Sequence, residues 1–148
     1  MALLNRRGLN TILATALRDC APDKLLAVYV LDLDGFKLVN DQFGHDVGDE
    51  LLEIVAGRLL TTMRVGDGIA RIGGDEFVVM AGGLQSDSQA RELGTKLLHA
   101  IREPYSLSQH TCHVAVTIGY VLAPLDEQHA DSMIKRADAA MYAGKQSG

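Results

Sequence analysis

Cysteine is scarce in this chain of 148 residues, which contains only Cys20 and Cys112. Two cysteines so far apart are typical of free thiols in a reducing cytoplasm rather than of a disulfide framework. Long hydrophobic runs are also lacking, because residues 25–31 fall far short of the roughly 20 residues that span a bilayer. No signal peptide is visible. We expect a cytoplasmic location, alone or as the cytoplasmic part of a membrane-bound protein, with no membrane contact from this domain itself.

An excess of positive charge is missing too. The chain has 14 Lys and Arg against 19 Asp and Glu, for a net charge of −5. Such a surface does not offset the repulsion of a phosphate backbone, so we expect no nucleic-acid partner. The charge does not exclude a single nucleotide that is bound through metal ions. Hydrophobic residues make up 47% and charged residues 22%, which is ordinary for a globular domain. We expect one domain over residues 1–148, cut from a larger protein.

The spacing of apolar residues predicts helices over 9–17, 36–43, 47–63, 88–101 and 131–143. It predicts strands over 25–33, 69–72, 77–81 and 114–121, with a weaker one near 105–107. The near-continuous apolar run at 25–33 is typical of a strand buried on both faces. This order of elements predicts an α/β (α+β) fold, a mixed sheet with helices packed against it.

Two glycines and then two acids lie between two of the predicted strands. Gly73-Gly74 favours a hairpin, because glycine tolerates the positive φ that primed turns require. We expect Asp75 and Glu76 to lie exposed at or next to the hairpin tip. An ordinary acidic turn is the alternative to a functional site.

Carboxylates also stand where the buried strand ends. Asp32 and Asp34 are costly there unless they are solvated, paired or metal-bound, and a charged strand end facing water is the alternative. If neighbouring strands bring Asp32 beside Glu76, the pair makes a hard-cation site of the kind that Mg²⁺ favours. Two such ions would serve in-line phosphoryl or nucleotidyl transfer. Lys37 and Lys145 offer charge for a polyphosphate, although each alone is more often a solubilising side chain.

A polar segment at residues 40–49 leads into the long predicted helix. Asp49 falls in the predicted first turn of that helix, where the helix dipole favours an acid without any ligand. A carboxylate can also accept the two parallel N–H donors of guanine, which adenine does not offer.

Four motifs, in this order along nearly the whole chain, resemble the GGDEF domains of the diguanylate cyclase family. They are Asp32-x-Asp34-x-Phe36-Lys37-x-x-Asn40-Asp41, Gly44-His45-x-x-Gly48-Asp49, Arg71-x-Gly73-Gly74-Asp75-Glu76-Phe77 and Ala137-Asp138-x-Ala140-x-Tyr142-x-x-Lys145. The resemblance implies a palm-like, ferredoxin-like, mostly antiparallel sheet flanked by helices, as in class III nucleotide cyclases. It also implies a bacterial signalling enzyme that joins two GTP into cyclic di-GMP and releases two pyrophosphates. The reaction needs a homodimer, because each 3′-hydroxyl attacks the other molecule's α-phosphate.

The resemblance also assigns roles to residues. Asp32, Glu76 and the Leu33 carbonyl would hold Mg²⁺, or Mn²⁺ in its place, with Asp75 beside them. Either Asp75 or Glu76 would help to deprotonate the 3′-hydroxyl. The residues assigned to the substrate are Phe36, Lys37 and Lys145 for the phosphates and Asn40 and Asp49 for guanine.

Arg64-x-x-Asp67 resembles the inhibitory motif of the same family and predicts a binding site for the product, cyclic di-GMP. The alternative is a surface salt bridge at a helix end. Two other functions stay open for the whole chain. One is a GGDEF module of weak or no activity that binds GTP or cyclic di-GMP and regulates an adjacent domain. The other is a different nucleotidyl transferase or cyclase that shares the palm.

Overall fold

The computed structural model describes residues 3–64, 66–107, 110–126 and 129–147. Its helices are α1 (Arg6–Asp19), α2 (Phe36–Phe43), α3 (His45–Thr62), α4 (Asp87–Arg102) and α5 (Ala130–Ser147). Its strands are β1 (Leu25–Asp34), β2 (Gly68–Arg71), β3 (Glu76–Leu84), β4 (Tyr105–Leu107), β5 (His110–Cys112) and β6 (Ala115–Ala123). Every predicted helix and strand is present. Among the strands of the described residues, only β5 was not predicted, because its three residues show no apolar alternation.

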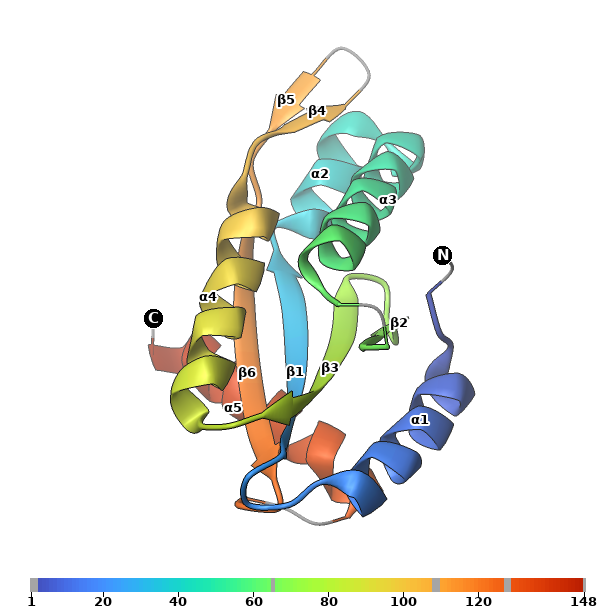
Figure 1. The fold of residues 1–148 in the computed structure, drawn as a ribbon. Coiled ribbons are helices and arrows are strands. Elements are labelled where there is room, and N and C mark those ends of the chain that lie inside the picture. Colours follow the sequence, from blue (N-terminus) through green and yellow to red (C-terminus); the bar gives the residue numbers. More distant parts are fainter. Residues whose placement is uncertain (1–2, 65, 108–109, 127–128, 148) are drawn as a thin grey trace.

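Four strands form the central sheet in the order β2-β3-β1-β6, and all three pairings are antiparallel. Strands β4 and β5 pair separately as a small hairpin beyond one end of the sheet (Figure 1). The expected α+β architecture, a mostly antiparallel sheet flanked by helices, is therefore confirmed. Strand β1 lies inside the sheet, so its backbone is hydrogen-bonded on both edges.

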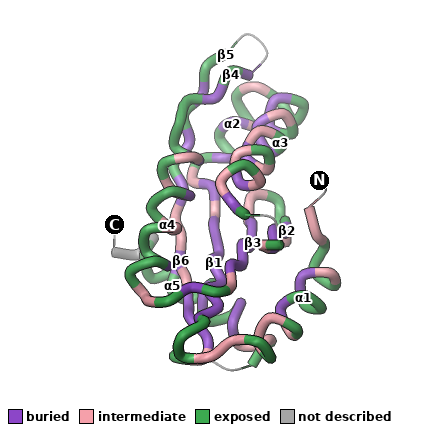
Figure 2. Tube along the Cα trace, viewed as in Figure 1, coloured by how far each residue is buried: buried purple, intermediate pink, exposed green. Residues whose placement is uncertain are grey.

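The two faces of the sheet bury two separate cores. Odd-numbered β1 residues such as Tyr29 and Leu31 pack under α2, α3 and α4, whereas Val28 and Val30 pack under α1 and α5. This alternation follows from the period of two in a strand. Figure 2 shows β1 as the buried centre of the molecule, and burial on both faces agrees with its unbroken apolar sequence.

Helix α5 lies directly against β6 at Gly119. A Cβ placed on Gly119 would stand 2.1 Å from the backbone nitrogen of Met141 and 2.4 Å from the carbonyl oxygen of Ala137. Only a residue without a side chain lets the helix approach the sheet this closely. The close approach holds α5, which carries Asp138 and Lys145, against the sheet.

Cys20 and Cys112 are both free thiols, as predicted. None of the helices in the described part of the chain combines the length and the apolar composition that a membrane crossing requires.

We predict that Gly119→Ala lowers the free energy of unfolding by about 3 kcal/mol, since the helix or the strand must move to accommodate the methyl group. Urea unfolding measures this change. The matched control is Gly57→Ala in α3, where a Cβ meets nothing within 4 Å. That variant should gain up to about 1 kcal/mol, because alanine is the better helix former. Equal effects at the two positions would contradict the packing described for α5.

Candidate active site

Asp32 and Glu76 lie opposite each other in the central sheet. The register of β1 and β3 pairs Asp32 with Glu76, one position beyond the pair Leu31 and Phe77. Strand alternation places both carboxylates on the α1/α5 face, because Val30 and Val78 belong to the core on that side. Residues that are far apart in the sequence are thus brought together, as the strand-end hypothesis required.

The loop from β2 to β3 holds Asp75 and Glu76 half-buried rather than exposed. Arg71 pairs with Phe77, which confirms the hairpin. The expectation of positive φ at Gly73-Gly74 is wrong, because neither is among the glycines with positive φ. Five residues separate the last paired positions, so the chain reverses without the two-residue primed turn that needs that conformation.

Backbone hydrogen bonds tie this loop to itself and to β1. The Ile72 amide donates to the Glu76 carbonyl at 3.0 Å, and the Leu33 amide donates to the Asp75 carbonyl at 3.1 Å. Leu33 is buried, so its main chain is fixed beside the acids. The loop therefore places Asp75 and Glu76 as a unit against the end of β1.

The carboxylates crowd one another. Burial raises the pKa of Glu76 above its ordinary value, and the negative charges of Asp138 and Asp32 raise it further. A side-chain hydrogen bond to Asp138 and the charge of Asp75 act in the same direction. Asp138 was not predicted as a site residue. It follows the buried Ala137 on α5, and its nearness to Glu76 depends on how α5 packs on the sheet.

Asn40 on α2 lies against Gly48 of α3, the residue that precedes Asp49. A Cβ on Gly48 would stand 1.7 Å from Asn40 Oδ1, so the carboxamide occupies the space left by that glycine. This buried oxygen has no hydrogen-bond partner among the described residues. Asp49 is exposed in the next position. Because α3 begins at His45, the acid in its first turn is Asp46, and the helix-dipole explanation for Asp49 is wrong.

The residues predicted to contact phosphates lie at two helix ends. Gly35, with φ of 87°, turns the chain from β1 into α2, whose first residues are Phe36 and Lys37. Phe36 is buried, while Lys37 is exposed. Lys145 lies in the last turn of α5, and its side chain is outside the described part of the structure.

Arg64 and Asp67 form a separate pair, about 20 Å from Glu76 as measured along β3. Asp67 Oδ2 accepts from the Arg64 backbone amide at 2.8 Å and pairs with Arg64 Nε at 3.4 Å. Arg64 Nη2 donates to the carbonyl oxygen of Gly82, near the other end of β3, at 2.7 Å. Arg64 and Asp67 therefore form a salt bridge just after the end of α3, with the Arg64 side chain exposed and the Asp67 side chain buried.

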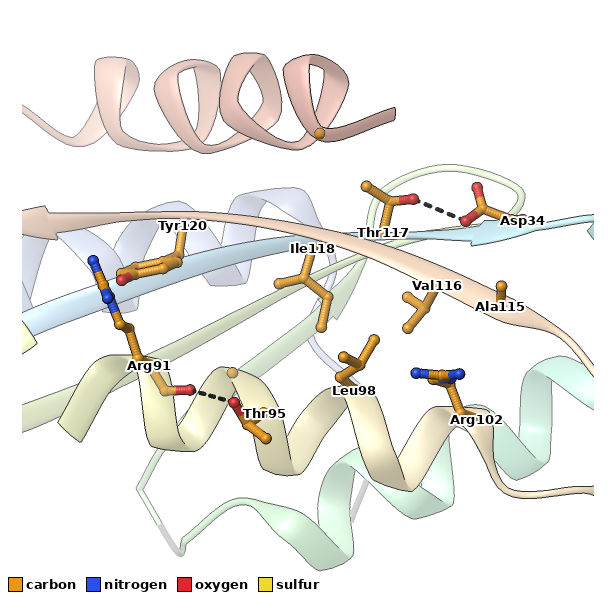
Figure 3. A pocket seen from close by; sticks show the side chains of 12 residues that line it. Asp34, Arg91, Thr95, Leu98, Arg102, Ala115, Val116, Thr117, Ile118 and Tyr120 are labelled. Atoms are coloured by element: carbon orange, nitrogen blue, oxygen red, sulfur yellow. Dashed lines mark hydrogen bonds between the residues drawn. The ribbon is translucent and has the colours of Figure 1, made fainter. Parts of the chain in front are cut away.

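A groove of about 1000 Å³ lies between α4 and β6 (Figure 3). Arg91 and Arg102 line it from α4, and Val116, Ile118 and Tyr120 line it from β6. None of the predicted site residues whose side chains are described lines it. Thr117 also lines the groove and links it to β1, because it pairs with Asp32 in the register of β1 and β6 and its hydroxyl donates to Asp34 at 2.8 Å. The groove and the candidate active site are thus lined by different residues.

The acidic residues suit a hard cation. Carboxylate and main-chain oxygens are the donors that Mg²⁺ prefers, and mutual repulsion around Glu76 is relieved by bound positive charge. Within the described residues, no group of three or more His, Cys, Asp or Glu side chains is arranged to hold a metal. The chain therefore supplies two facing carboxylates rather than a complete cage, which matches the one or two carboxylates that Mg²⁺ takes when substrate phosphates complete its shell.

Comparisons with known proteins agree with one another. Residues 2–148 match the family model described as diguanylate cyclase, GGDEF domain. MucR from Pseudomonas aeruginosa, named as a bifunctional diguanylate cyclase and cyclic di-GMP phosphodiesterase, is 44% identical over 90% of this chain and 19% of its own length. TpbB from the same species, named as a diguanylate cyclase, is 37% identical over 97% of this chain and 34% of its own length.

Two solved structures share the fold. The GGDEF domain of TpbB is 35% identical with a TM-score of 0.94, and the match covers 99% of this chain and 92% of that one. The GGDEF domain of DgcB from Caulobacter crescentus, in complex with c-di-GMP, is 26% identical with a TM-score of 0.85, over 99% of this chain and 87% of that one. The chain thus spans only a fifth to a third of the two curated relatives named above.

We predict that Glu76→Gln raises the melting temperature near pH 8 when no divalent cation is added. Because the pKa of Glu76 is raised in the folded state, the fold is more stable when this side chain is protonated. That stability is present at low pH and is lost as Glu76 ionises, when the pH rises through the folded-state pKa. Glutamine does not ionise and avoids that loss. The gain should vanish below the ordinary glutamate pKa of 4.5. Thermal unfolding across pH measures it, with the exposed Glu92→Gln as control; a gain independent of pH would contradict the assignment.

Proposed function

The chain belongs to the GGDEF domain family of diguanylate cyclases, and we propose that it condenses two GTP into cyclic di-GMP and two pyrophosphates. The observation that carries this proposal is the pairing of Asp32 with Glu76 on one face of the sheet, with Asp75 tied to Leu33 beside them. Carboxylates held this close together are costly unless they are solvated, protonated, paired or bound to a cation, and such groups cluster at functional sites.

Asp32, Glu76 and the Leu33 carbonyl would hold Mg²⁺, or Mn²⁺ in its place, with Asp75 adjacent. The ion, when bound, would polarise the α-phosphate and lower the pKa of the 3′-hydroxyl. Asp75 or Glu76 would take the hydroxyl proton.

The substrate would lie between this acidic cluster and the junction of α2 with α3. Asp49 would accept the paired N–H donors of guanine, and Asn40 Oδ1, which has no hydrogen-bond partner among the described residues, would supply a further acceptor. The backbone amides of Phe36 and Lys37, with the charges of Lys37 and Lys145, would bind the phosphates.

The glycines of the hairpin fit a close approach of the substrate. A Cβ on Gly74 would meet nothing within 4 Å, and one on Gly73 would make only an ordinary contact at 3.4 Å. The fold itself therefore does not require glycine at either position. Their bare backbone leaves room for a phosphate or a second nucleotide at the loop.

One such site holds one GTP, so closure of the cyclic product requires two copies of the domain facing each other with twofold symmetry. We propose that this homodimer forms in the cytoplasm and that the domain is one part of a larger signalling protein. Arg64 and Asp67 would bind the cyclic di-GMP product and inhibit the enzyme. Binding there would replace the hydrogen bond from Arg64 to Gly82 with contacts to the ligand.

The proposed activity predicts that Glu76→Ala lowers the turnover of GTP by roughly 10³-fold, since it removes one of the two facing carboxylates. Chromatography and mass analysis of products formed with GTP and Mg²⁺ at high protein concentration measure this loss. Glu92→Ala, an exposed glutamate on α4, should leave turnover unchanged. Full activity in Glu76→Ala would refute the proposal. GTP binding without turnover, even in the full-length dimeric protein, would instead indicate a regulatory module.

The proposed product site predicts that Arg64→Ala weakens the binding of cyclic di-GMP at least about tenfold, because a guanidinium that pairs with phosphate or guanine is lost. Isothermal titration calorimetry measures the affinity. Arg18→Ala, which removes an exposed arginine from α1, serves as the matched control. Unchanged affinity in Arg64→Ala, or no binding by the wild-type protein, would contradict a product site here.

A further inference from the structure

Arg71, the last residue of β2, holds the loop that carries the acids. Its Nε donates to the carbonyl oxygens of Gly73 at 3.1 Å and Gly74 at 3.2 Å, and its Nη2 donates to Gly74 at 2.9 Å. These contacts join the start of the loop to its middle. Among the described residues, Arg71 makes no ion pair with a carboxylate.

The glycines in the middle of the loop contribute little of their own to holding it in place. Gly73 and Gly74 have no side chains to pack, and glycine is the residue with the greatest backbone freedom in the unfolded chain. After the glycines, the carbonyl of Asp75 accepts from the Leu33 amide and the carbonyl of Glu76 accepts from the Ile72 amide. The guanidinium therefore restrains the two glycines, which lie between the residues that these two backbone bonds hold.

Arg71 approaches the loop from the face opposite to Glu76. Ile69 packs in the core under α2, α3 and α4, so strand alternation directs Arg71 to that face, whereas Glu76 points to the α5 face. The arginine thus acts on the backbone and leaves the Glu76 carboxylate available for a cation or a substrate.

We propose that Arg71 is a positioning residue for Glu76, and that it acts by clamping the glycine carbonyls of the loop. The kinetic part of this inference rests on the proposed cyclase function, whereas the clamp itself does not. A planar guanidinium presents Nε and Nη2 as a rigid fork that can hold both carbonyls at once. A lysine ammonium is a flexible point charge and cannot reproduce that geometry.

Steady-state kinetics of Arg71→Ala and Arg71→Lys test the kinetic part. Because misplacement of a reacting group lowers the rate of the chemical step, kcat should fall roughly 10²-fold in Arg71→Ala. KM for GTP should stay within about twofold, since other residues bind the nucleotide. Arg71→Lys should resemble Arg71→Ala, and Arg18→Ala should match the wild type. Unchanged kcat, or a raised KM with normal kcat, would overturn the proposal.

Amide hydrogen exchange of the same variants tests the clamp without any turnover. The Leu33 and Ile72 amides should exchange roughly tenfold faster in Arg71→Ala, while Val28 and Val30 inside β1 keep their protection. Unchanged exchange at Leu33 and Ile72 would overturn the clamp. If Val28 and Val30 also lose protection, Arg71→Ala has loosened the whole sheet. The exchange of the Leu33 and Ile72 amides is then measured in Arg71→Lys, where unchanged exchange would overturn the clamp. A wild-type protein that makes no cyclic di-GMP would refute the proposed function, and the exchange result would still decide the role of Arg71.

Discussion

The antiparallel register between β1 and β3 is the constraint on which the candidate site depends. It sets Asp32 opposite Glu76, and both strands bury their two faces in different cores. A slip of one residue would move Val28 and Val30 into the core under α2, α3 and α4 and turn Asp32 away from Glu76. The same apolar residues that stabilise the sheet therefore also determine where the carboxylates lie.

The candidate active site lowers the free energy of unfolding of the domain. Carboxylates held close together and partly removed from water raise the pKa of Glu76, and Asn40 buries an acceptor without a partner among the described residues. Such features persist only where the surrounding structure leaves no alternative. Here the support comes from β1, which is hydrogen-bonded on both edges, and from α5, which lies against Gly119.

Glycines in the family motifs have two different physical roles. Gly48 makes room for the Asn40 carboxamide, so the packing of α2 on α3 requires it. Gly74 has open space around the position of a Cβ, and its φ is not positive. The two adjacent glycines of the motif, Gly73 and Gly74, thus contribute little to the fold of the single chain. Their value lies in an exposed backbone, which a neighbouring arginine restrains and a ligand can approach.

The sequence alone determined the secondary structure and the chemical types at the site. Apolar spacing is a local property, and it predicted every described helix and all the described strands except β5, which was too short to give a signal. The motif residues identified the acids, the amide and the lysines. Local rules failed at the hairpin glycines and at Asp49, because turn type and helix start depend on the neighbouring chain.

Only the tertiary structure decided which of these residues meet. Asp32 faces Glu76 through strand pairing, Asp138 joins them through the packing of α5, and Arg64 closes on Gly82 at the opposite end of β3. None of these contacts follows from sequence spacing, since each joins separate elements whose relative positions are set by burial of two cores. The chain encodes the groups locally, whereas their distances, and with them the raised pKa of Glu76, arise from non-local packing.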